Sequence, residues 1–98
     1  MPLAYVINEI WVTDTEAYGE YVRQSSATLE PFGGRFIVRG GNGTPLVGEA
    51  PSARVVVIEF PSRDAAESWF ASDAYQTILK IRNAASTSRV FIVDGVAT

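Results

Sequence analysis

The clearest strand and the clearest helix of this 98-residue chain follow one another in Arg54-Val-Val-Val-Ile-Glu-Phe-Pro-Ser-Arg-Asp-Ala-Ala-Glu-Ser-Trp-Phe70. The apolar run from Arg54 to Phe60 is typical of a buried strand, and Ser62 stands where a helix cap is expected. Glu59 is the one charged residue inside that strand. Burying an unpaired carboxylate is costly or raises its pKa, so Glu59 needs a partner or has a function.

The pattern on either side of this stretch predicts three more strands, at residues 3–12, 35–39 and 89–94. A first helix is expected from Thr13 to about residue 30, with Thr13 and Glu16 as a capping box. The helix at 63–71 restarts at Ser72 and runs to about residue 82, and residues 83–88 are expected to form a loop. Leu46-Val47 is considered as a short extra strand. The order βαββαβ predicts one ferredoxin-like α+β domain over residues 1–98, with a four-stranded antiparallel sheet and both helices on one face.

The predicted strands are apolar on both faces. Val55 and Val57 point one way, and Val56, Ile58 and Phe60 point the other. An antiparallel sheet with one face in water shows polar alternation instead. Because the helices cover only one face, we expect a second copy of the sheet to cover the other, in a homodimer.

The composition excludes several classes of site. The net charge is −3 and the eight basic residues are scattered, so we expect no nucleic-acid partner. The chain contains no cysteine and no histidine, which removes thiol and imidazole chemistry and the usual zinc and haem ligands. We therefore predict no metal and no cofactor. Without a long apolar run or a recognisable signal peptide, we expect a cytoplasmic protein with no membrane contact.

Three motifs resemble the DUF1330 family over about residues 3–95. They are Gly33-Gly-Arg-Phe-Ile-Val-Arg-Gly-Gly41, Val55-Val-Val-Ile-Glu-Phe-Pro-Ser-Arg63, and Ser72-Asp-Ala-Tyr-Gln76 together with Arg82. The resemblance implies a dimeric α+β barrel, in which two sheets pair face to face, and it implies no assigned function. The chain departs from the family pattern at Phe32, where members often carry His or Tyr.

The candidate ligand-binding residues are Tyr21, Phe32, Arg39, Glu59, Trp69 and Arg82. Glu59 is interpreted either as a general base in a pocket between sheet and helices, or as the partner of Arg39, Arg54 or Arg82 in an ion pair. Arg39 suits a carboxylate or phosphate as well as a solvated strand end, and Arg82 suits the negative end of a helix dipole. The aromatic residues fit a core at least as well as a binding pocket.

Three functions agree with these observations. We favour a homodimer that binds a small acidic or aromatic ligand between sheet and helices. The superfamily resemblance offers a cofactor-independent enzyme, monooxygenase- or isomerase-like, with Glu59 as candidate catalytic base. The third is a structural or interaction module.

Overall fold

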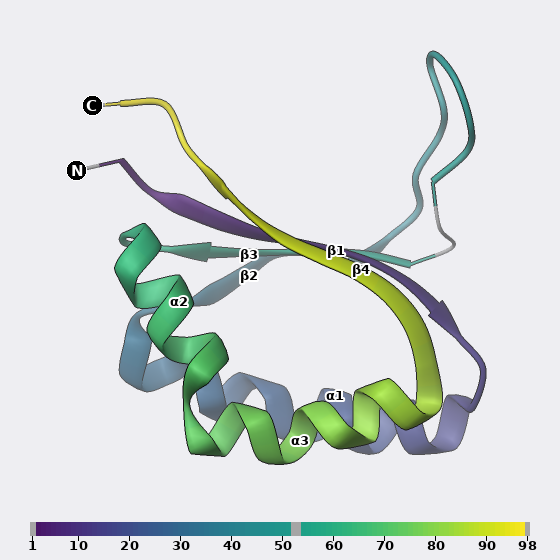
Figure 1. Cartoon of the computed structure of the whole chain (residues 1–98). Helices are drawn as coiled ribbons and strands as arrows, with labels where there is room; N and C mark the ends of the chain where they lie inside the picture. Colours follow the sequence, from purple (N-terminus) through teal and green to yellow (C-terminus); the bar gives the residue numbers. More distant parts are fainter. Residues whose placement is uncertain (1, 52–53, 98) are drawn as a thin grey trace.

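The chain alternates strands and helices in the order βαββαβ, with the second helix divided in two (Figure 1). The computed structural model describes residues 2–51 and 54–97. Its elements are β1 (Ala4–Val12), α1 (Thr15–Leu29), the 3₁₀ helix η1 (Glu30–Phe32), β2 (Arg35–Gly41), β3 (Arg54–Phe60), α2 (Arg63–Ala71), α3 (Asp73–Ala85) and β4 (Ser86–Asp94). The strands form one antiparallel sheet in the order β2-β3-β1-β4. This arrangement confirms the predicted ferredoxin-like α+β fold.

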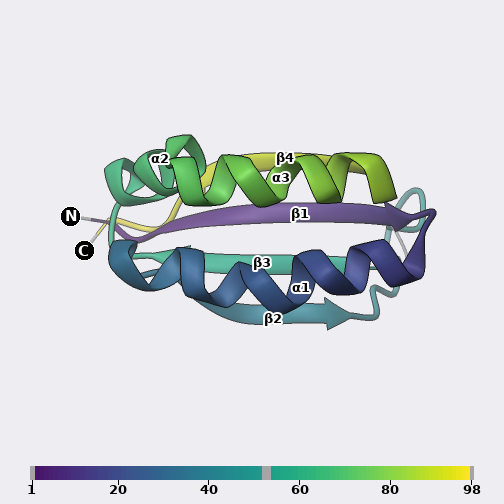
Figure 2. The ribbon, with the colours of Figure 1, turned by 90° about the horizontal axis from the view of Figure 1, so that it is seen from below.

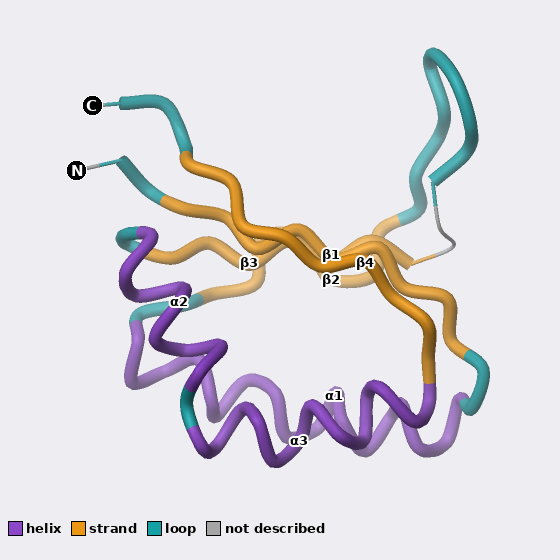
Figure 3. Tube along the Cα trace, viewed as in Figure 1, coloured by secondary structure: helices purple, strands orange, loops and turns teal. Residues whose placement is uncertain are grey.

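All helices lie on one side of the sheet (Figure 3). Seen from below, α3 covers β1 and β4, and α1 covers β3 and β2 (Figure 2). From Ala4 to Ile10 of β1 the even-numbered residues are buried, because they face the helices, while the odd-numbered residues of the strand are at least partly exposed. We call these two surfaces the helix face and the open face.

An aromatic and aliphatic core fills the space between the helix face and the helices. Its largest fully buried side chains are Trp69, Tyr75, Phe60 and Val6. The rings of Trp69 and Tyr75 lie 4.0 Å apart between centroids, and the rings of Trp69 and Phe60 lie 5.3 Å apart. Burial of such side chains contributes about 1.5–3 kcal/mol each to folding.

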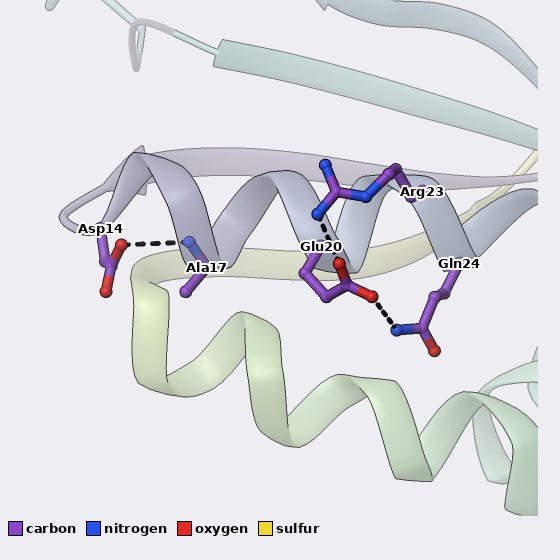
Figure 4. A network of polar contacts seen from close by, with 5 residues as sticks. All are labelled: Asp14, Ala17, Glu20, Arg23 and Gln24. Carbon is purple, nitrogen blue, oxygen red and sulfur yellow. Dashed lines mark hydrogen bonds and ion pairs between the residues drawn. The ribbon is translucent and has the colours of Figure 1, made fainter.

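Helix α1 begins one residue later than the sequence pattern indicated. The side chain of Asp14, and not that of Thr13, is the cap, accepting a hydrogen bond from the Ala17 backbone amide at 3.1 Å (Figure 4). The capping box predicted for Thr13 and Glu16 is therefore wrong. Farther along the helix, on its exposed side, Glu20 pairs with Arg23 and accepts a hydrogen bond from Gln24 (Figure 4). The predicted caps at Ser62 and Ser72 are both confirmed.

Two further predictions of local structure are wrong. Residues 83–88 do not form a loop, since α3 continues to Ala85 and β4 begins at Ser86. The backbone amides of Thr13 and Asp14 donate to the Ala85 carbonyl at 2.8 and 3.0 Å, which fixes this junction to the end of β1. Leu46 and Val47 belong to no strand and lie in a bend of the β2–β3 connection. None of the described helices is long and apolar enough to span a membrane.

Candidate functional site

A chain of four buried polar side chains crosses the core from α1 to the sheet. The hydroxyls of Tyr21 and Tyr75 are hydrogen-bonded at 2.8 Å. Arg82 donates from one terminal nitrogen to the Tyr75 hydroxyl at 3.1 Å and to Oδ1 of Asn8 at 3.4 Å. Asn8 in turn donates to the backbone carbonyl of Val56 at 3.1 Å. The network therefore joins α1, α3, β1 and β3.

Arg82 brings a positive charge into this network. Its residue is only 4% exposed, because the third turn of α3 points it toward the sheet. Among residues 2–51 and 54–97 no carboxylate forms an ion pair with it, and its Nε atom is buried without a hydrogen-bond partner. A guanidinium remains charged at all ordinary pH values, so within the described part of the chain neutral dipoles alone offset this charge.

Both tyrosines of the network are held in the neutral form. Burial, the largest cause, raises the pKa of Tyr21 well above its ordinary range, and the neighbouring Tyr75 raises it further. Burial also raises the pKa of Tyr75, although the charge of Arg82 opposes this change. At neutral pH the two hydroxyls therefore act as hydrogen-bond donors or acceptors and not as bases.

A small cavity opens beside the network on the β2–β3 side. Its volume is about 20 Å³, which is room for about one water molecule. No carboxylate is among its lining residues, which include two arginines: Asn8, Ile10, Tyr18, Tyr21, Val22, Ser25, Phe36, Arg39, Arg54, Val56 and Ile58. Arg39 lies over the ring of Phe36 and Arg54 over the ring of Tyr18, 4.5 and 5.3 Å from the ring centres. The wall of the cavity is thus both aromatic and cationic.

The structure brings three of the sequence-predicted residues to this place and gives two others a different role. Tyr21 and Arg39 line the cavity, and Arg82 lies behind Asn8 and Tyr21. Trp69 is a core residue whose indole N–H donates to the Thr28 hydroxyl at 3.0 Å. Phe32 is half-buried and packs against the same core.

Glu59 lies on the open face, on the other side of the sheet from the cavity. It shares that face with Val55 and Val57, as the strand pattern predicted. Its partner is Arg35 on β2, at 3.0 Å, so the predicted partners Arg39, Arg54 and Arg82 are all wrong. The position directly across from Glu59 on β2 is Arg35, whereas Arg39 lies across from Val56. A carboxylate placed there cannot take a proton from a ligand between the sheet and the helices.

Sequence reasoning missed Asn8 and the position of Arg54 in the wall. A signal for Asn8 was present, since Ala4, Val6 and Ile10 occupy the same side of β1 and make Asn8 the one polar residue of a buried row. The described residues contain no group of three His, Cys, Asp or Glu side chains that could hold a metal ion.

Residues 3–96 match a family described as "Domain of unknown function (DUF1330)". The chain belongs to the DUF1330 family. No curated protein matches the chain.

Solved structures share the fold of this DUF1330 chain at low identity. The RPA0582 protein of unknown function from Rhodopseudomonas palustris superposes with a TM-score of 0.79 at 23% identity, over 99% of this chain and 85% of that one. SnoaB, a cofactor-independent oxygenase from Streptomyces nogalater, superposes with a TM-score of 0.63 at 14% identity, over 100% and 97%. A putative antibiotic biosynthesis monooxygenase from Caulobacter crescentus gives 0.61 at 12% identity, over 98% and 92%. These similarities establish the fold.

Proposed function

We propose that this protein is a homodimer that binds a small organic anion, such as an aromatic carboxylate, between its sheet and its helices. The observation that carries the proposal is the charge of Arg82, which is buried and has no ion pair among the described residues. A buried charge without a counterion is costly, and a bound anion removes that cost. Tyr21 and Asn8 separate Arg82 from the cavity, so they are the groups a ligand meets first.

The wall of the cavity favours the same class of ligand. Arg39 and Arg54 add two cations, while Tyr18, Tyr21 and Phe36 offer ring surfaces. The cavity admits a carboxylate in place of a water molecule, whereas an aromatic ring needs outward movement of a rim side chain. Arg39 is suited to that movement because it is exposed and lies near the end of edge strand β2.

The test compares benzoate with benzamide, a neutral molecule of nearly the same shape, by thermal unfolding. A ligand at 100 times its Kd stabilises a protein by about 2.7 kcal/mol, which raises the Tm of a domain of this size by roughly 10 °C or more. We expect benzoate to raise the Tm and benzamide to leave it unchanged. Equal responses to both, or none to a panel of carboxylates at high concentration, contradict the proposal.

The variant Arg82→Met separates binding from folding. It removes a buried charge, which is favourable, but leaves Oδ1 of Asn8 without its donor, which is unfavourable, so the Tm of the free protein should change little. The increase in Tm with benzoate should disappear. A variant that still responds to benzoate shows that Arg82 is not the counterion.

The homodimer is supported by the charge pattern of the open face. Arg35 pairs with Glu59 at one corner, and Arg89 pairs with Glu9 at 2.8 Å at the diagonally opposite corner. In both pairs the glutamate side chain on the inner strand is less than 20% exposed, and the arginine side chain on the edge strand is about 70% exposed. A two-fold axis that runs between two facing copies along the line joining these corners sets each corner against the same corner of the partner, where each glutamate can meet an arginine of the partner.

A cofactor-independent enzyme is the second candidate. The neutral hydroxyl of Tyr21, with the charge of Arg82 behind it, is a donor arrangement suited to a developing oxyanion. If a bound carboxylate is recovered unchanged after aerobic incubation, the result supports binding alone. If the protein converts an aromatic enol or phenol and the variant Arg82→Met does not, the result supports catalysis.

A further inference from the structure

The connection between β2 and β3 forms a projecting arm, whose described residues are 42–51. It rises from the sheet on the side opposite to the helices (Figure 1). Two adjacent aliphatic residues at its bend, Leu46 and Val47, are each 94% exposed. Gly48, with φ +81°, makes the turn that follows them. At the base, Gly43 packs so closely on Pro51 that no Cβ fits, which holds the two limbs of the arm together.

A groove lies at the opposite edge of the sheet, beside β4 and α2. Its volume is about 360 Å³, within the range of sites that bind small molecules or anchoring side chains. The groove is apolar apart from one arginine: Val6, Arg63, Phe70, Val90, Phe91 and Ile92 line it. Phe91 belongs to the open face, while Val90 and Ile92 belong to the helix face, so residues from both faces of β4 line the groove.

We propose that Leu46 and Val47 of one copy dock in the β4 groove of a second copy, so that the two subunits exchange arms. The proposal rests on the homodimer described above. The arm of a chain cannot reach its own groove, because it starts at β2 and β3, rises away from the sheet, and is separated from β4 by β1.

The length of the arm is sufficient for its tip to reach past the partner's sheet. Facing sheets pack about 10 Å apart. Five extended residues, from Asn42 to Leu46, span at most about 17 Å. Because this reach exceeds the spacing of the sheets, the arm is long enough for its tip to pass beside the edge of the partner's sheet. At the β4 edge it meets the groove, whose apolar lining suits two aliphatic side chains.

The absence of cysteine from the sequence permits a direct test by disulfide crosslinking. A chain carrying Val47→Cys is mixed with a chain carrying Val90→Cys and oxidised, so a mixed disulfide can form only between two molecules. We expect a covalent dimer to form rapidly, since the two Cα atoms must come within about 7 Å. The matched control is Val96→Cys, because Val96 is a similarly exposed valine, at 88%, that lies outside the arm. Phe91→Cys provides a second groove position if Val90→Cys unfolds.

Dimer dissociation provides the second measurement. We expect the double variant Leu46→Ser, Val47→Ser to raise the dissociation constant about 10-fold or more, and Val96→Ser to leave it unchanged, because only the first removes apolar surface that becomes buried. A dimer with crosslinking no faster than the Val96 control overturns the arm exchange and leaves the homodimer standing. A chain that is monomeric at tens of micromolar overturns both.

Discussion

At the scale of the residue, the sequence suggests a solvated Arg82 and a buried Glu59, and the structure shows a buried Arg82 and a partly exposed Glu59. Arg82 lies in the last turn of α3, where a cation is ordinarily solvated, yet it is buried and its partners among the described residues are neutral. Glu59 follows four apolar residues, yet it lies beside Arg35 on a face that the helices do not cover. The period-2 pattern of β3 placed Glu59 correctly with Val55 and Val57. It could not choose which of the two faces meets the helices, because both faces are apolar.

The tyrosine network predicts a loss of stability at high pH. The pKa of Tyr21 is raised in the folded state, while in the unfolded chain it stays near its ordinary value of about 10. The contribution of the neutral hydroxyl is thus fully present below pH 10 and is lost as the pH rises further, because the unfolded state then releases its proton more readily. We expect urea-unfolding free energies of Tyr21→Phe to fall less between pH 8 and pH 10.5 than those of the native chain. A fall equal to that of the native chain would contradict this prediction.

Glu59 provides a prediction of no effect at the cavity. The variant Glu59→Gln keeps the shape of the side chain and removes its charge on the open face, so the Tm response to benzoate should equal that of the native chain. Stability should change by about 1 kcal/mol or less, because its partner Arg35 is well exposed. A lost response to benzoate would place the ligand on the open face and contradict the proposed site.

At the scale of the element, some boundaries of helices and strands are set by local sequence signals and others by tertiary contacts. The bounds of β3 and α2 follow from local signals alone, namely an apolar run and a serine cap. The end of α3 does not, because Ala84 and Ala85 favour a helix while Ser86 to Ser88 resemble a loop. What extends β4 to Ser86 is its pairing with Val12 of β1, a contact that is distant along the chain.

The α1 cap gives a prediction with a built-in control. Asp14 accepts the Ala17 amide hydrogen bond and its charge suits the positive end of the helix (Figure 4). Asp14→Ala should therefore lower the free energy of unfolding by about 1 kcal/mol, as removal of a helix cap typically does. Thr13→Ala removes the cap that the sequence suggested and should cost clearly less in the same urea titration. Equal losses for the two variants would show that the cap energy does not reside in the Asp14 side chain.

At the scale of the whole molecule, the unusual feature is a sheet that is apolar on its uncovered side. Trp11, Val38, Phe91 and Val93 on this face are each more than a third exposed. The sequence predicted this surface correctly, because strand periodicity is a local property. It could not predict the cavity, since Arg39, Arg54 and Tyr21 come from three different elements and meet only through packing.

The open face leads to a prediction for the assembled protein. Val57 lies at its centre, across from Ile7 on β1 and Val38 on β2. An aspartate there remains hydrated in a monomer but is buried without a partner when a second sheet covers the face, which is strongly unfavourable. Light scattering should therefore give twice 10.6 kDa for the native chain and 10.6 kDa for Val57→Asp. Val96→Asp, an exposed position off the sheet, should stay dimeric. Because the cavity lies within one subunit, benzoate should still raise the Tm of monomeric Val57→Asp. If the variant loses both dimerisation and the response to benzoate, the partner helps to form the ligand site.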